Sequence, residues 1–122
     1  MTLIAEPAYV MAVLLLYVDL PDTPDRTSAY DRMVAHSLFQ RGVSVEVVES
    51  AMLLACLRRS VRPPGAPPLP RIRSLAYFSP VIEELQQPHV SVGYLEYVRD
   101  KARRVFQRDV GKNIPSQDCA PR

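Results

Sequence analysis

The side chains that most often carry out chemistry in proteins are sparse in this sequence and lie apart. The two histidines are His36, within a helical pattern, and His89, after a proline, and neither has a Cys or acidic residue at metal-ligand spacing. The acidic pairs, such as Glu83/Glu84, have no evident acid–base partner. There is no glycine-rich phosphate loop and no nucleophile motif. We therefore expect no enzymatic activity, no metal site, no cofactor and no small-molecule substrate.

Arginine is the one chemically versatile side chain in abundance. The chain has 15 basic residues at a net charge of +2, and only Lys101 and Lys112 are lysine. Guanidinium groups form bidentate bonds to phosphate and stack on bases, although a GC-rich genome also enriches arginine, and composition leaves both explanations open. On the functional interpretation, these residues contact nucleic-acid phosphates without reading sequence: Arg58, Arg59, Arg62, Arg71, Arg73, Arg99, Lys101, Arg103, Arg104 and Arg108.

The last helical pattern, from Val92 to about Gln107, combines an apolar seam with several cations. Successive apolar residues are three, four and three positions apart along the seam: Leu95, Val98, Ala102 and Val105. A second chain could complete this seam. The cations lie mostly off it and form either a phosphate-binding stripe or a solvated face in which Glu96 and Asp100 pair with Arg103 and Arg104.

The elements that would position these residues are helices. Pro7 suits the first turn of a helix that ends near Val18, and Gly42 suits the end of another. Ser28 with Asp31, and Ser44, are the expected caps of helices that run to about Arg41 and Ser60. We predict an all-α fold: a single compact bundle of five or six helices over residues 1–110, a Pro-rich crossover loop at 61–71 and a disordered tail at 111–122.

Three local expectations concern burial and helix breaks. In the second helix, the apolar face is expected to carry Tyr30, Met33, Val34 and Leu38. Between Ser74 and Gln87, either the helix kinks at Pro80 or Ser79 caps a new helix with Pro80 in its first turn. Cys56 lies in an apolar helix and is expected in the core.

The apolar run from Ala8 to Val18 is too short for a bilayer, which needs roughly 20 residues. No basic residue precedes it and no small-residue cleavage site follows it, so it is a poor signal peptide. It is either a helix buried on most sides or a segment that docks on a partner. With no membrane span and only Cys56 and Cys119 as cysteines, we expect a cytoplasmic protein.

The stretch from Phe39 to Ala55 has the outline of a helix-turn-helix. A DNA-reading second helix offers polar or basic side chains near its N-terminus, whereas this one carries Val45, Glu46 and Glu49 there. Carboxylates at that end would face phosphates, and the rest of the helix is almost wholly apolar. We therefore interpret it as a core helix.

The order "VEVVESAMLLACLRR", a break, then "IRSLAYFSPVIEEL" resembles the C-terminal helical domain of DnaD-type replication-initiation and helicase-loader proteins. In that family a basic turn follows an apolar helix and precedes a helix with Tyr, Ile and Trp four residues apart. Tyr77, Val81 and Leu85 occupy those positions here, with Tyr77 alone identical and Pro80 inside the motif. The resemblance covers Val45–Leu85. It implies nucleic-acid binding near this helix and contact with a replicative helicase or initiator.

The leading hypothesis is a small non-enzymatic accessory protein that binds nucleic acid, with DNA favoured over RNA, in replication or in a mobile element. The alternative is a protein–protein adaptor or a small subunit of a larger complex, possibly a homodimer, with no nucleic-acid contact of its own. The apolar N-terminal helix and the Leu95–Val105 seam support the alternative.

Overall fold

The helices begin where the sequence supplies a capping side chain. At the start of α2 (Ala29–Gln40), the Asp31 amide donates to the Ser28 hydroxyl at 3.1 Å, and the Ser28 amide donates to the Asp31 carboxylate at 2.9 Å. Ser44 caps α3 (Val45–Ser60) through its side chain. Between the two helices Gly42 has a φ of 75°, the left-handed conformation that glycine adopts without strain. These predicted boundaries are confirmed.

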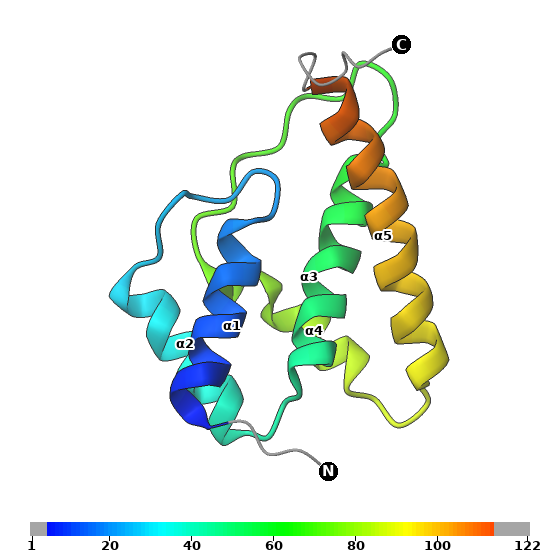
Figure 1. Cartoon of the computed structure of the whole chain (residues 1–122). Coiled ribbons are helices and arrows are strands. Elements are labelled where there is room, and N and C mark those ends of the chain that lie inside the picture. The colour runs from blue at the N-terminus through cyan, green and yellow to red at the C-terminus, as the bar shows by residue number, and fades with distance from the viewer. Residues whose placement is uncertain (1–4, 114–122) are drawn as a thin grey trace.

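A computed structural model describes residues 5–113 of the chain, and over that range every regular element is a helix (Figure 1). The predicted all-α bundle is confirmed. α3 lies in the middle and contacts α1, α4 and α5, whereas α2 packs against α1 and η1. The elements around α2 and α3 are α1 (Glu6–Val18), the 3-10 helix η1 (Leu75–Phe78), α4 (Ser79–Leu85) and α5 (Val92–Asn113).

α3 is the central helix, and most of its circumference is buried. The interpretation of this segment as a core helix is confirmed, because a groove-reading helix would keep one face in water. Cys56 is 3% exposed, as expected for a core residue, and burial raises the pKa of its thiol to about 11 against an opposing effect of Arg59. The buried residues of α3 are Val48, Ser50, Ala51, Met52, Leu54, Ala55, Cys56 and Leu57.

α1 is buried or half-buried on most of its sides, as the first of the two alternatives predicted, and only a narrow outer face is exposed. Tyr9, Val13 and Tyr17 recur every four residues and point into the core. Met11 and Leu15 lie on the outer face and are 60% and 59% exposed. Among the residues that the structure describes, neither α1 nor any other helix combines the length and the apolar character needed to cross a membrane.

The buried face of α2 also differs from the expected one. Leu38 is buried as predicted, but Tyr30 and Met33 are exposed, and Asp31 and Ala35 take the inward positions. The Asp31 carboxylate is 1% exposed and accepts a hydrogen bond from the Leu75 amide at 2.9 Å, in addition to its capping bond. Asp31 therefore faces the core because its carboxylate accepts hydrogen bonds from two backbone amides. The buried face of α2 consequently lies around a different side of the helix from the one predicted.

The segment from Ser74 to Gln87 forms two helices rather than one kinked helix, in agreement with the prediction that a new helix begins with Pro80 in its first turn. η1 precedes α4, and Pro80 lies in the first turn of α4, where its missing N–H is not needed. Phe78, rather than Ser79, is the residue before α4. α5 runs to Asn113, past its expected end near Gln107, so residues 111–113 are helical instead of belonging to the predicted tail. The rest of that tail lies outside the described residues.

The Pro-rich loop carries the chain from the end of α3 back along the bundle to η1 (Figure 1). Its second half is anchored: Ile72 is 2% exposed, and its amide donates to the Asp22 carbonyl at 2.9 Å. The Arg71 guanidinium donates to the neighbouring Thr23 carbonyl at 3.1 Å. The loop is thus fastened to the segment between α1 and α2.

Candidate nucleic-acid interface

Arg59 is an enclosed arginine of the predicted binding set. Its side chain is 11% exposed, and the guanidinium donates to the Tyr77 hydroxyl, the Asp22 carboxylate and the Pro70 carbonyl at 3.0–3.2 Å. It also lies 5.5 Å from the centroid of the Tyr77 ring. These contacts tie three segments together and leave little of the guanidinium for a ligand.

Arg58 is held from the other side of α3. Its two terminal nitrogens donate to the two Glu84 carboxylate oxygens at 2.9 and 2.7 Å, a bidentate pair between α3 and α4. These hydrogen bonds lower the pKa of Glu84 and raise that of Arg58. About half of each side chain is exposed, so water screens the pair.

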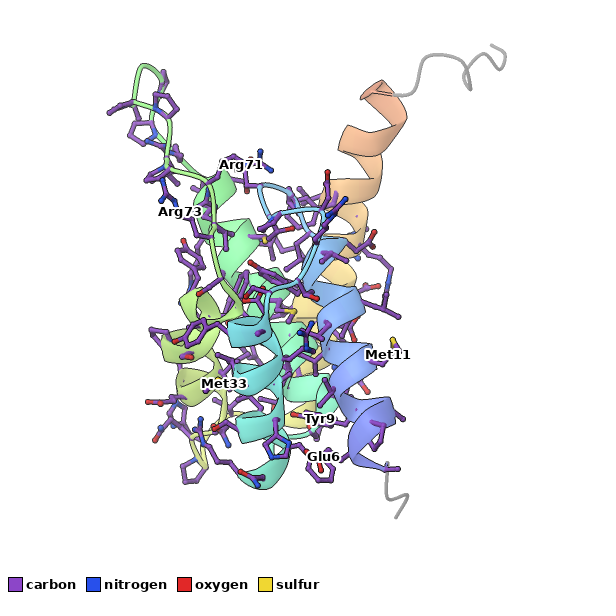
Figure 2. The ribbon with its side chains drawn as sticks, turned by 90° about the vertical axis from the view of Figure 1, so that its left-hand side faces the viewer. Glu6, Tyr9, Met11, Met33, Arg71 and Arg73 are labelled. Carbon is purple, nitrogen blue, oxygen red and sulfur yellow. The ribbon has the colours of Figure 1, made fainter. Side chains whose placement is uncertain are left out.

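The loop arginines differ among themselves. Arg62 donates to the Pro67 carbonyl within the loop, and Arg71 donates to the Thr23 carbonyl. Arg73 is exposed, and no ion pair or side-chain hydrogen bond joins it to the residues that the structure describes. Figure 2 shows Arg71 and Arg73 close together where the loop returns to the bundle. Of the three, Arg73 keeps its cationic group available.

The predicted cations of α5 lie on two sides of the helix. Arg99 turns toward α3, where it donates to the Ser50 hydroxyl at 3.1 Å. Arg103 and Arg104 share one carboxylate, with nitrogens 3.7 and 2.7 Å from the Asp100 oxygens, so the trio keeps one net positive charge. The predicted single stripe is therefore divided. The side chain of Arg108 lies outside the described part of the chain.

The seam that was expected to meet a second chain is covered by the protein's own α3. Leu95 is 8% exposed, Val98 2% and Ala102 0%, and α3 and α5 share an extensive contact. Val105 is half-buried at the edge of this contact. In this fold the first three residues are core residues and are not available to a partner.

Beside this contact, α3 and α5 enclose an open groove of about 530 Å³. Its apolar wall includes Val61, which is 80% exposed, and its outer lip carries Tyr94 and Tyr97, at 39% and 54%. Two cations line it and no acidic residue does. The lining residues are Leu54, Leu57, Arg58, Ser60, Val61, Tyr94, Tyr97, Val98, Lys101 and Val105.

Lys101 is the cation most closely associated with the groove's aromatic lip. Its ammonium nitrogen lies 5.9 Å from the centroid of the Tyr97 ring. The two tyrosine rings are neighbours, with centroids 6.4 Å apart and planes inclined by 31°. Arg104 lies about one turn beyond Lys101 on the same side of α5. We call Tyr94, Tyr97, Lys101 and Arg104 the α5 lip.

The tyrosines of the α5 lip were missed in the sequence reasoning, although a signal for them exists. Each residue of the lip directly precedes a residue of the buried seam, so the lip repeats the seam's spacing of three, four and three. A stripe shifted by one residue lies about 100° around a helix. Two aromatic residues followed by two basic residues on such a flank combine the residue types expected of a nucleic-acid surface.

The remaining chemistry-bearing residues do not come together. His36 forms an ion pair with Glu6 when the imidazole is protonated, joining α2 to α1, and His89 is exposed in the loop before α5. Figure 2 shows Glu6 at the N-terminal start of α1, at the other end of the bundle from the Pro-rich loop. Over the described residues, no three His, Cys, Asp or Glu side chains gather as a metal site requires.

Comparisons with protein-family models, with curated proteins and with solved structures found no match for this chain. The resemblance of Val45–Leu85 to DnaD-type proteins stays a prediction, on which none of these comparisons bears.

Proposed function

We propose that this protein is a small non-enzymatic accessory protein that binds nucleic acid through the α3–α5 groove and its α5 lip. The observation that carries the proposal is the composition of the groove, in which Lys101 lies beside two exposed tyrosines and no acidic residue is in the lining. Arg58 adds a second cation to the lining, and its partner Glu84 lies outside it. Phosphate contacts supply most of the affinity of proteins that bind without sequence preference. Arg73 is a further phosphate contact in this proposal.

A role in replication or in a mobile element, with DNA preferred over RNA, is the narrower form of the proposal. Its support is the resemblance of Val45–Leu85 to DnaD-type proteins. In the present chain this segment includes α3, which contributes apolar residues to the groove. The reducing cytoplasm favoured by the low cysteine content is part of the same proposal.

The test is fluorescence anisotropy with labelled single- and double-stranded DNA and RNA, at salt concentrations of about 50 mM and about 200 mM. We expect binding that weakens steeply with salt. The double variant Lys101→Glu, Arg104→Glu should bind about 10-fold more weakly or worse, since it loses two phosphate contacts and adds two repulsive charges.

A matched control changes the charge equally on another side of the bundle. Arg26 and Arg32 are exposed and lie in and near the start of α2, which does not contact α5 in the way α3 does. The variant Arg26→Glu, Arg32→Glu should bind nearly as the original protein does. Equal losses of affinity in the two variants would mean that binding depends on net charge and not on the groove. If the original protein bound no nucleic acid at low salt, the proposal would be refuted.

A second candidate function is that of a protein–protein adaptor, favoured by the exposed apolar side chains of α1 and α2. Met11, Leu15 and Met33 are each at least 59% exposed. Figure 2 shows Met11 on α1 and Met33 on α2. A mass that rises with concentration in solution, without nucleic-acid binding, would favour this function over the first.

A further inference from the structure

We infer that the α3–α5 groove takes single-stranded nucleic acid, with a base stacked on Tyr97 and neighbouring phosphates held by Lys101 and Arg104. This inference rests on the proposed function and specifies which form of nucleic acid the same site accepts.

The first argument is that the tyrosines of the α5 lip do not serve the core. Tyr9 and Tyr17 on α1 are 4% and 0% exposed, and Tyr9 packs edge-on against Phe39. Tyr94 and Tyr97 instead leave much of their rings in water and contact each other at the edge of the groove. Neighbouring, partly exposed aromatic rings of this kind are the side chains on which unstacked bases stack.

The second argument is the surface behind the rings. Leu57 of α3 and Val61, the residue directly after α3, continue the apolar lining from the lip to the opposite wall, and Val61 is 80% exposed. A base stacked on Tyr97 would cover part of this surface and remove it from water, which stabilises the complex. The volume of the groove, about 530 Å³, falls within the usual range of ligand sites.

The third argument is charge complementarity around the same rings. Lys101 lies over Tyr97, Arg104 follows by about one turn, and Arg58 lines the opposite wall. Asp100 lies beside the α5 lip, and its carboxylate is shared by Arg103 and the lip residue Arg104, so these three residues together keep one net positive charge. A phosphodiester backbone that follows α5 therefore meets cations on both sides of the aromatic lip.

The form of the nucleic acid follows from how the bases are presented. In a duplex the base faces are stacked on one another, and a protein at the rim contacts phosphates and groove edges. Only unpaired, unstacked bases can lie face to face with a tyrosine ring. A site that consists of two aromatic faces with cations beside them therefore favours a single strand.

The test compares three ligands of equal length on the original protein: single-stranded DNA, an abasic strand with the same phosphates, and duplex DNA. We expect the single strand to bind at least about 5-fold more tightly than the abasic strand, since stacking on an aromatic side chain contributes at least that much. Equal affinity for the single-stranded and abasic ligands would overturn the inference, and this comparison does not depend on how any variant folds.

Variants then locate the stacking. Tyr97→Ala should weaken single-strand binding about 10-fold while leaving the slope of log affinity against log salt unchanged, because no charge is lost. Tyr97→Phe should retain the affinity because it keeps the ring. Tyr30→Ala removes an equally exposed tyrosine from α2 and should have no effect. An unaffected Tyr97→Ala protein would overturn the inference.

These outcomes separate the inference from the proposed function. Salt-dependent binding that Lys101→Glu, Arg104→Glu abolishes but Tyr97→Ala leaves intact would refute stacking and retain the phosphate-binding function. Tighter binding to duplex than to the single strand would do the same. An original protein that binds none of the three ligands at low salt would refute both.

Discussion

The arginines around the Pro-rich loop and the cations along α5 differ in what their charged groups contact. Arg59 and Arg71 donate to carbonyl or carboxylate oxygens from distant parts of the chain, and these contacts fasten the loop to the bundle. Lys101 faces an exposed ring, and Arg104 shares its carboxylate partner with Arg103. The same residue types therefore have two roles: Arg59 and Arg71 hold the fold, whereas Lys101 and Arg104 lie beside the groove, where a polyanion can reach them.

The largest expected effect is a difference in stability between a variant of a fold-holding arginine and a variant of an α5 lip arginine. Arg59→Met keeps much of the aliphatic stem but removes the hydrogen bonds to Asp22, Tyr77 and Pro70. We expect the free energy of unfolding, measured by urea denaturation, to fall by about 1–2 kcal/mol. The matched substitution Arg104→Met, at an exposed ion pair, should change it by less than about 0.5 kcal/mol. Equal losses would mean that the two groups do not differ.

The second expected effect is a difference between Arg104 and Arg71 in how their loss changes the salt dependence of nucleic-acid binding. Arg104→Gln should reduce the slope of log affinity against log salt by about 0.7 for a single strand, the change expected for one phosphate contact. Arg71→Gln should leave the slope unchanged, because Arg71 holds the loop to the Thr23 carbonyl and is not among the residues that line the α3–α5 groove. Anisotropy titrations across a salt series measure both slopes, and a reduced slope for Arg71→Gln would place this arginine among the ligand-binding cations.

The smallest effect concerns Arg58, which belongs partly to each group because it binds Glu84 and also lines the groove. The pKa of Glu84 is lowered in the folded protein, so the pair stabilises the fold above the usual glutamate pKa near 4.3, and this stabilisation disappears as pH falls through the lowered value. Glu84→Gln should cost about 0.5 kcal/mol at neutral pH, since the pair is half exposed.

The pH dependence of urea denaturation checks this sign. The difference in unfolding free energy between the original protein and Glu84→Gln should shrink toward zero as the solution becomes more acidic than the lowered pKa. A difference that grows on acidification would contradict the assignment of Glu84 as the carboxylate that Arg58 stabilises.

Helix boundaries could be predicted from the sequence where they depend on contacts between residues close together in the chain. The capping box of Ser28 and Asp31, the Ser44 cap and the turn at Gly42 involve contacts within a few residues, and these boundaries were predicted. The inward position of Asp31 was missed because its second hydrogen bond goes to the Leu75 amide, which is 44 positions away. No local pattern contains that partner.

The candidate site was predicted in part for the same reason. Sequence analysis placed Arg58 and Arg59 in one binding set with the other cations, because their partners Glu84 and Asp22, which decide that these guanidinium groups are engaged, come from distant segments. It also treated the seam of α5 as a partner surface, since nothing local indicated that α3 would cover it. The positions of Tyr94 and Tyr97 beside the seam could have been predicted from their spacing. Their exposure could not, because it depends on how far α3 covers this side of α5.

The most direct measurement of the central claim is photocross-linking of the original protein to a single strand that carries 5-bromodeoxyuridine, followed by peptide mapping. We predict cross-links in the first half of α5, foremost at Tyr97, with a weaker signal near Val61 on the opposite wall of the groove. Cross-links confined to α2 or to the Pro-rich loop, or none at low salt, would contradict the assignment of the α5 lip as the nucleic-acid surface.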